Sequence, residues 1–591
     1  MKKLLLFLIV AGVFGAGGYF LWLRFQTSYP ESVFPADTVA YVYFHNVDEA
    51  KKNLPKTTLW QQIEKSPRRK TYDKQLDGLF SFVETSTGVD LHPLFQQFRR
   101  DLALGLFPVP GHKTGAAFVG YVKSESDTEH FLEHNVDPNL KRRIPDLQKS
   151  GLSYNGTTYY RYNSSRFPEG ISPAYAVTNH HLLFAYSEES LKTLLDVKKG
   201  TVGPLKKSEI FQSAKKRISF KRGLLTFVDA QRALTMIKDS LSPARQKFWP
   251  TIMKISGLNG LQSFVYSVNV ANEGFEENGY LELKPDREGL LKIYFQQHPQ
   301  KLQGIAAIPV DSKVMNGGTL ADFAKMWDEV NAQLNAILSP ADYDKWQKIL
   351  NAMRGIFNFD VRRDLLEPLG SEFCFSYEAP DENISDPTRL RYLLIVQLRN
   401  PQKFRETLDR AVSLASLRGL QQKQESYNGK KIQSFDLQLS QFTISPAYCL
   451  DGSWFYFSTN NVLLKKAVDA QTQKKGIESL DDYRKVTSGF PDEVNSLSYT
   501  NVSAYLQMYS AILSRQANDP ENRWIQEYGL REEFASLGKS LFGAASYSRI
   551  EKDGMYIHSY ASVPTSFLAL PAIASALPTI VKQYNTRRTE E

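Results

Sequence analysis

Hydrophobic and polar residues alternate along much of this chain in short runs that are typical of β-strands. Two Asn-Gly pairs, at 155–156 and 428–429, each stand between two such runs. An Asn-Gly pair in this setting is a strong sequence signal for a two-residue β-hairpin. The runs "HLLFAY" (181–186) and "WFYF" (454–457) continue the pattern, so we predict further strands there.

The hydrophobic period changes from strand to helix directly after these runs. Ser187 is a suitable N-cap residue, and Gly200 is the residue type that most often ends a helix. Three leucines between them fall on one helix face: Leu191, Leu194 and Leu195. Residues 393–412 show the same change from strand to helix. We therefore predict an α+β protein, mainly antiparallel sheet with amphipathic helices packed on it.

An internal repeat organises the chain. Residues 153–175 and 426–448 both begin with "SYNG" and end with "ISPAY", at an offset of 273 positions, and the similarity continues on both sides. We predict two tandem homologous units, each large enough for its own core. The predicted divisions are a transmembrane helix at 1–24, a linker at 25–33, repeat unit 1 at 34–303, repeat unit 2 at 304–563 and an apolar, Pro-containing tail with a basic end at 564–591.

The N-terminus predicts the location of the protein. Residues 4–23 are a run of 20 uncharged residues, which as a helix spans about 30 Å, the thickness of a bilayer's hydrocarbon core. Lys2 and Lys3 precede the run and favour a cytoplasmic N-terminus. A cleaved signal peptide is the alternative, but its apolar region is normally shorter. We expect an uncleaved signal anchor in a bacterial cytoplasmic membrane, with the bulk of the chain in the periplasm or outside.

The sequence also resembles a known family. The start "FPADTVAYVYFHNVDEA" (34–50), the "YNG" hairpin, the strand followed by a short helix and the single N-terminal anchor are similar to the bacterial domain-of-unknown-function family 3352. The resemblance covers nearly the whole part after the anchor and implies an envelope location. It implies no activity and no site residues. The second copy departs from the start motif, because residues 308–324 lack the apolar strand after the proline.

Charge and cysteine content narrow the function classes. The formal net charge is +9, with basic clusters at 68–70, 141–143 and 215–222. Such clusters are either a solvated basic face or a surface for an anionic lipid or glycan. Nucleic acid is not expected, because the chain is predicted to leave the cytoplasm. The chain has two cysteines, Cys374 and Cys449, which excludes a disulfide framework, and we expect two buried free thiols, with a single bridge as the alternative.

One stretch carries a pattern of catalytic chemistry. His130, Glu133 and His134 fit H-x-x-E-H, which resembles the core motif of the pitrilysin-type zinc peptidases. In that interpretation the histidines bind zinc, Glu133 polarises a zinc-bound water, and a third ligand comes from one of three downstream residues: Glu188, Glu189 or Glu209. The residues after the motif do not match those enzymes, and the repeat places an ordinary amphipathic helix there. We therefore assign no catalytic residue, metal or cofactor.

The interpretation that follows is a single-pass, envelope-anchored, non-catalytic binding or scaffolding module. A lipid or peptide groove between the two repeats is the predicted site. Two alternatives stay open: a zinc-dependent hydrolase that uses residues 130–134, and an assembly factor that contacts another envelope protein. The tail, with a proline every seven residues, is expected to dock onto the domain or to lie at the membrane surface. The sequence does not specify an oligomeric state.

Overall fold

A computed structural model of the chain describes residues 29–65, 98–110, 112–220, 222–378, 391–416, 421–439, 442–518, 530–538 and 540–568. The predicted anchor at 4–23, the basic cluster at 68–70 and tail residues 569–591 lie outside these ranges. None of the helices in the described ranges combines the length and the apolar character that a membrane span needs. The chain divides into two compact units. Unit 1 lies within Met1–Lys51, Asp73–Lys216 and Phe220–Ala233, and unit 2 lies within Lys52–Tyr72, Arg217–Ser219 and Leu234–Glu591.

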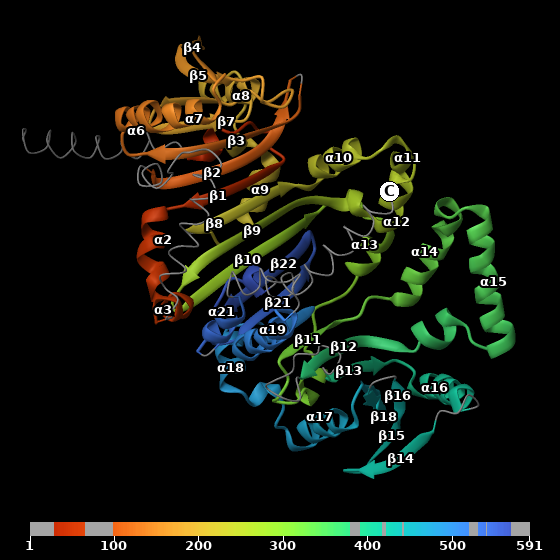
Figure 1. The fold of residues 1–591 in the computed structure, drawn as a ribbon. Helices are drawn as coiled ribbons and strands as arrows, with labels where there is room; N and C mark the ends of the chain where they lie inside the picture. The colour runs from red at the N-terminus through yellow and green to blue at the C-terminus, as the bar shows by residue number, and fades with distance from the viewer. Residues whose placement is uncertain are drawn as a thin grey trace, which may run out of the picture. The chain divides into compact units, whose positions relative to one another are not determined.

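Unit 1 is built on an antiparallel sheet (Figure 1). Its described strands are β1 (Ala40–His45), β2 (Phe98–Val109), β3 (His112–Val122), β4 (Gln148–Tyr154), β5 (Thr157–Asn163), β6 (Ala174–Thr178), β7 (His181–Ala185) and β8 (Gly223–Asp229). They pair in the order β4-β5-β6-β7-β3-β2-β1-β8. Since β1, β2, β3 and β7 each pair on both sides, their backbone groups are used within the sheet.

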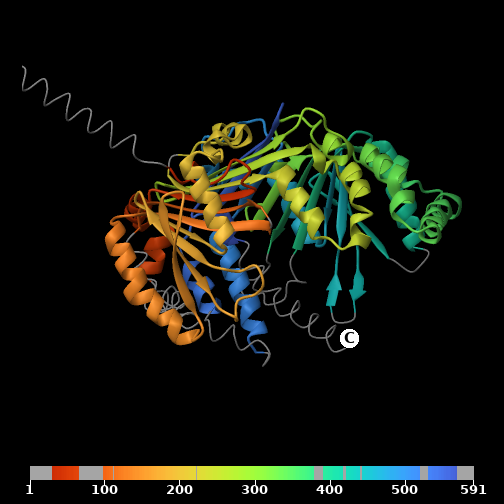
Figure 2. The same cartoon turned by 90° about the horizontal axis from the view of Figure 1, so that it is seen from above.

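Helices cover both faces of the unit 1 sheet. They are η1 (Pro30–Ser32), α6 (Glu125–Phe131), η3 (Leu132–Val136), α7 (Asp137–Arg143), α8 (Glu188–Lys199), η4 (Leu205–Lys207) and α9 (Glu209–Lys216), while α2 (Val47–Asn53) and α10 (Ala230–Ser240) contain division points between the units. Figure 2 shows α6, η3 and α7 as one continuous helix, in orange. The predicted cap residues of α8 are confirmed: the Ser187 side chain accepts from the Ser190 backbone N–H, and Gly200 ends the helix with φ of 85°.

Unit 2 is built on a longer antiparallel sheet. Its described strands are β9 (Leu261–Ala271), β10 (Gly274–Leu283), β11 (Val314–Thr319), β12 (Leu369–Glu378), β13 (Arg391–Leu398), β14 (Gln422–Tyr427), β15 (Lys430–Phe435), β18 (Ala447–Asp451), β19 (Trp454–Ser458), β20 (Ser496–Thr500), β21 (Ala544–Glu551) and β22 (Gly554–Ala561). They pair in the order β9-β10-β22-β21-β20-β11-β12-β13-β19-β18-β15-β14. Strands β16 (Leu437–Leu439) and β17 (Phe442–Ile444) form a separate pair.

The helices of unit 2 include a hairpin that stands away from its sheet (Figures 1 and 2). That hairpin consists of α14 (Phe323–Ile337) and α15 (Pro340–Phe357). The other described helices of this unit are η2 (Leu54–Lys56), α3 (Thr58–Lys65), α11 (Pro243–Gln246), α12 (Trp249–Ser256), η5 (Leu258–Gly260), α13 (Gly289–Tyr294), η6 (Gly304–Ala307), η7 (Val361–Leu366), α16 (Pro401–Ser416), α17 (Asn461–Gln473), η9 (Ile477–Ser479), α18 (Asp481–Thr487), α19 (Val502–Gln516) and α21 (Leu530–Leu537). The predicted α+β class with antiparallel sheet is confirmed.

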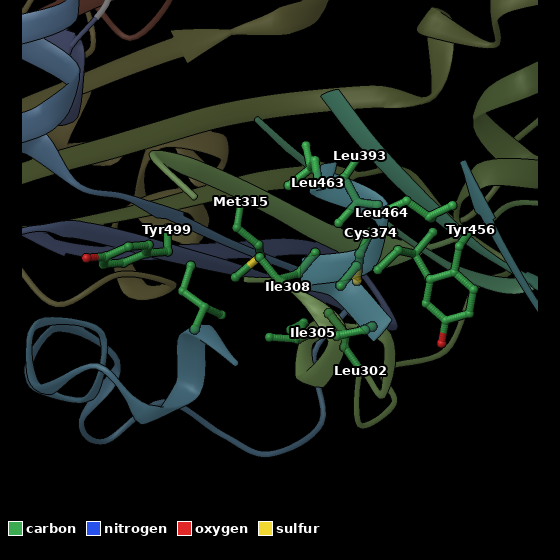
Figure 3. Packing of buried hydrophobic residues seen from close by; sticks show 14 of the residues in the cluster. Leu302, Ile305, Ile308, Met315, Cys374, Leu393, Tyr456, Leu463, Leu464 and Tyr499 are labelled. Atoms are coloured by element: carbon green, nitrogen blue, oxygen red, sulfur yellow. The ribbon is translucent and has the colours of Figure 1, made fainter. Parts of the chain in front are cut away.

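A hydrophobic core holds η6, α17 and α18 of unit 2 on its sheet (Figure 3). Side chains from η6, from the strands and from α17 meet there, and Ile308, Leu393 and Leu464 are each fully buried. Cys374 and Cys449 belong to the same core and are unbridged, which confirms the predicted pair of buried free thiols. Burial raises the pKa of Cys449 to about 11, so the residue is a protonated thiol at neutral pH.

Both predicted Asn-Gly hairpins are confirmed, and each is held by the same contacts. In the β4–β5 turn, Asn155 has φ of 53° and Gly156 has φ of 80°, as a type I′ turn requires. The Tyr154 hydroxyl and the Asn155 amide both donate to the carboxylate of Asp196 on α8, at 3.1 Å and 2.7 Å. An aspartate at the end of the following helix therefore fastens the hairpin tip.

The β14–β15 turn repeats these contacts 273 positions later. Asn428 and Gly429 have φ of 46° and 75°. The Tyr427 hydroxyl and the Asn428 amide donate to Asp469 on α17, at 2.8 Å and 2.7 Å. The matching contacts show why the "SYNG" letters recur: each copy needs the tyrosine, the left-handed turn and the aspartate together.

The second copy nevertheless contains the strand that its letters did not predict. Residues 314–319, "VMNGGT", form β11, which pairs with both β12 and β20, so a strand follows Pro309 although its letters are not the apolar ones of the first copy. A Cβ at Gly317 would stand 3.2 Å from the Cys374 sulfur, so the small residue lets neighbouring side chains approach the strand closely. The compact units divide the chain near residue 233 instead of residue 303, and the repeat boundaries at 34–303 and 304–563 stay a prediction.

Candidate functional site

The H-x-x-E-H residues lie on the helix formed by α6, η3 and α7. His130, Glu133 and His134 are all exposed to solvent. The helix widens to π geometry from Leu132, and the two histidine rings stack with centroids 4.0 Å apart. His134 Nδ1 lies 3.0 Å from the carbonyl oxygen of His130, so that nitrogen donates a hydrogen bond and is not available to a metal.

The described residues supply no third ligand around this pair. Across the described ranges, no group of three His, Cys, Asp or Glu side chains is arranged to hold a metal ion. Glu188, one of the three residues considered as a ligand, accepts instead from Tyr159, Arg161 and Lys192. The geometry at 130–134 is that of a helix surface.

The basic clusters that the structure describes are mostly paired or solvated. Lys141, Arg142 and Arg143 are exposed on α7. In the 215–222 cluster, Lys215 pairs with Glu31 at 2.9 Å, and Arg222 pairs with Glu49. Neither cluster presents a converging set of free cations.

A different surface of unit 1 has the character of a binding site. The strand registers align two rows of side chains on one face of β1, β2, β3 and β7. The first row is Val42, Leu104, Phe118 and Phe184, and the second is Ala40, Leu106 and Ala116. Every member is apolar, whereas the solvent face of an antiparallel sheet is normally polar. We call this surface the apolar hollow.

The hollow has a volume of about 420 Å³, within the usual range for small-molecule sites. Small side chains at Ala40 and Ala116 lie beside the larger Leu104, Phe118 and Phe184, which creates the depression. Leu104 is 55% exposed, Phe184 43% and Leu106 41%. These are large exposures for side chains in the middle of a sheet.

The hydrophobic core formed with α8 lies on the opposite face of these strands, away from the hollow. Tyr41, Phe107 and Leu183 point to that face and are fully buried, together with Leu191 and Leu194 of α8. The α6–α7 helix covers part of the hollow's own face, where it packs on Phe98 and Leu182. Phe118 of the first row still packs against this cluster. Beyond it, Leu104, Leu106 and Phe184 remain exposed among the described parts of unit 1.

The hollow offers no free hydrogen-bond donor to a ligand among its described side chains. Its lining side chains are hydrocarbon except that of Tyr186, and the Tyr186 hydroxyl already donates to the carbonyl oxygen of Thr114. The backbone groups of the four strands are paired on both sides. The favourable free energy of binding a ligand in the hollow therefore comes from the burial of apolar surface.

Sequence reasoning missed this surface, although one signal for it is present. Residues 102–107 read "LALGLF", in which both alternating sets are apolar. A strand with two apolar faces is buried on both or carries an uncovered face. The pattern alone does not distinguish these outcomes, because it contains nothing about which helix lies over which face.

Comparisons with known proteins add a family but no function. Residues 344–537 match the model of a family described as "Protein of unknown function (DUF3352)", which is a narrower stretch than the predicted resemblance. No curated protein matches the chain. Two solved structures with a similar trace are titled "Structure of crystal form I of TP0453" and "Structure of crystal form III of TP0453". They are 10% and 9% identical, cover 46% of this chain and 85% and 86% of theirs, and have a TM-score of 0.24, which is too low to imply a shared fold.

Proposed function

We propose that this chain, in which residues 344–537 form a DUF3352 family domain, is a non-catalytic envelope protein that holds a lipid acyl chain. The observation that carries the proposal is the apolar hollow of unit 1, a surface in the middle of a sheet that is open among the described residues and hydrocarbon apart from Tyr186. This surface takes the place of the groove between the repeats that the sequence suggested.

The chemistry of the hollow favours a hydrocarbon chain over a peptide. A bound peptide brings N–H and C=O groups that must be hydrogen-bonded when they leave water. The hollow has no free polar side chain and no free strand edge to pair with them. An acyl chain has no such groups, and the row from Val42 to Phe184 crosses four strands, about 14 Å at the usual strand spacing.

The exposed areas set the scale of the interaction. Full burial of a Leu or Phe side chain contributes about 1.5–3 kcal/mol, so covering the exposed half of Leu104, Leu106 and Phe184 contributes about 1 kcal/mol each. The sum of about 3 kcal/mol corresponds to an affinity gain of roughly a hundredfold before the entropic cost of binding. That strength suits reversible holding of a lipid.

The remaining features of the proposal concern location and organisation. The uncharged run at 4–23 would anchor the chain in a bacterial cytoplasmic membrane with the bulk outside the cytoplasm, where lipids are within reach. Two tandem homologous units of about 270 residues would form that outer part. The hairpin contacts repeated at an offset of 273 support this duplication.

Photo-crosslinking in cells tests the proposal on the full chain. Cells expressing the protein are fed a fatty acid that carries a diazirine, irradiated, and the cross-linked peptides of the purified protein are mapped by mass spectrometry. We expect adducts on β1, β2, β3 and β7, reduced about five- to tenfold in Leu104→Ser and Phe184→Ser. Ile356→Ser on α15 is the matched control, because Ile356 is 74% exposed and lies outside the hollow.

The result that rejects the proposal is equally concrete. Adducts spread evenly over exposed apolar residues, or adducts at the hollow that survive both serine substitutions, would show that the hollow does not select an acyl chain.

A further inference from the structure

A second cavity lies wholly within unit 2 and has the opposite character. It has a volume of about 660 Å³ and is lined by residues of α13, α14, η7, β12 and the start of α16, among others. Its charged lining residues are Asp322, Lys325, Arg362, Glu367, Arg399 and Lys403. Neutral polar side chains complete the wall: Gln296, Gln297, Ser371 and Asn400. A cavity of this size and polarity is suited to a small polar ligand.

Most of the cations in this cavity already have carboxylate partners. Lys325 pairs with Asp322 at 3.3 Å, and Lys403 lies 3.6 Å from Glu367. Arg362 pairs with Glu367 and, at 2.7 Å, with Asp328, which is outside the lining. These pairs cancel one another's charge and hold the wall in place.

Arg399 differs from the other lining cations. Its side chain is exposed, and no carboxylate of the described residues lies within ion-pair distance of it. Burial by itself raises the pKa of Asp322, but the hydrogen bonds from the Lys325 backbone N–H and side chain outweigh this effect, so the pKa is lowered. The positive charge of Arg399 lies near enough to Asp322 to contribute to the lowering. The Arg399 backbone N–H donates to the carbonyl oxygen of Pro368 at 2.8 Å, which fixes the residue at the rim.

The neighbouring residues arrange donors beside this guanidinium. Asn400 caps α16 by accepting from the Lys403 backbone N–H at 3.0 Å, so the positive end of the helix opens at the same wall. Phe323, 39% exposed, adds an aromatic ring to the lining. A guanidinium with five N–H donors recognises a planar or tetrahedral oxyanion through paired hydrogen bonds.

We infer that this cavity binds a ligand with one anionic oxygen group, a carboxylate or a phosphate, held by Arg399 with Lys403 beside it. The inference does not rest on the proposed lipid function, because it concerns other residues in another unit. Arg362, Arg399 and Lys403 all fall within the stretch that matches the family model. The sequence suggested an anionic partner through its basic clusters, and this cavity offers a different place for an anionic group.

Isothermal titration calorimetry of the full chain in a nonionic detergent tests this inference. Inorganic phosphate and glucuronate, a sugar carboxylate, are titrated at low ionic strength into the natural chain, Arg399→Gln and Arg405→Gln. Arg405 is an exposed arginine on α16, the helix that begins two residues after Arg399, and it does not line the cavity, so it is the matched control. Arg399 makes no ion pair with the described residues, so its replacement is expected to leave the fold intact.

We expect the natural chain and Arg405→Gln to bind at least one of the two anions, with affinity that falls as salt rises. Arg399→Gln should bind it about 10- to 100-fold more weakly, the usual effect of losing a hydrogen bond to a charged group. Binding of phosphate alone would identify a phosphate ester as the ligand class, and binding of glucuronate alone a carboxylate. Absence of binding by either anion, or equal affinity in Arg399→Gln, would overturn the inference.

Discussion

Glu188 allows a quantitative test of the forces that hold unit 1 together. Its carboxylate, 9% exposed, accepts from the Tyr159 hydroxyl at 2.5 Å and from Lys192 at 2.8 Å, and it pairs with Arg161. Burial alone would raise the pKa of Glu188, but the hydrogen bonds from Lys192, Tyr159 and Arg161 outweigh it and lower the pKa to about 2. The ionised form is therefore favoured by folding.

The lowered pKa fixes the sign and the size of a pH effect. A carboxylate whose pKa falls from 4.5 to about 2 on folding contributes stability above pH 4.5, and this contribution is lost as the pH falls toward 2. The shift corresponds to about 3 kcal/mol. Because Arg161 and Lys192 are 31% and 34% exposed, solvent screening reduces the expected contribution to about 2 kcal/mol.

We predict that Glu188→Gln lowers the local stability of unit 1 by about 2 kcal/mol at pH 7, with the difference from the natural chain vanishing near pH 2. Hydrogen exchange of peptides covering β5 and α8, corrected for intrinsic rates at each pH, measures this difference directly. Glu169→Gln is the control, because Glu169 is exposed in the same unit. A difference that is independent of pH, or that grows in acid, would refute the ion-pair reasoning.

Three further predictions concern other parts of the fold. Asp196→Ala should lower protection of the β4–β5 hairpin by about 1–2 kcal/mol in hydrogen exchange, and Asp469→Ala should do the same for β14–β15, with each effect confined to its own hairpin. Gly105→Ala should lower the unfolding temperature by several degrees, because its Cβ would stand 2.4 Å from a buried aromatic ring; an unchanged value in thermal circular dichroism would contradict this. Cys374 and Cys449 should resist iodoacetamide in the native protein and react after denaturation, as mass spectrometry would show.

Local chemistry explains the features that the sequence predicted well. Asn-Gly turns, the Ser187 cap and the Gly200 terminus depend on a few neighbouring residues and on backbone conformations that only certain residues adopt. The repeated "SYNG" letters have a local cause as well, because each hairpin places a tyrosine and an asparagine near one aspartate about 42 positions later. At the H-x-x-E-H pattern, the repeat offered an amphipathic helix as the alternative to a zinc site, and the structure places these three residues exposed on a helix.

The candidate sites could not be predicted in this way. The apolar hollow exists because the α6–α7 helix covers only part of a sheet face, and the length of that cover is a property of packing. The anion cavity brings together Asp322, Arg362 and Arg399, which come from separate elements and are joined by no motif. Residues 314–319 form β11 although they include an asparagine and two glycines, because β12 and β20 pair with the strand on its two sides and Met315 is buried in the core.

The sequence by itself determined the class of fold, the two Asn-Gly hairpins, the caps of the helix at Glu188–Lys199 and the helix within residues 393–412. All of these follow from short-range backbone preference and hydrophobic period. Only the tertiary structure decided which faces are buried, which carboxylates are paired and which cations are left free. Those outcomes depend on contacts between residues far apart in the chain, where burial and electrostatic pairing are set by geometry that no local pattern contains.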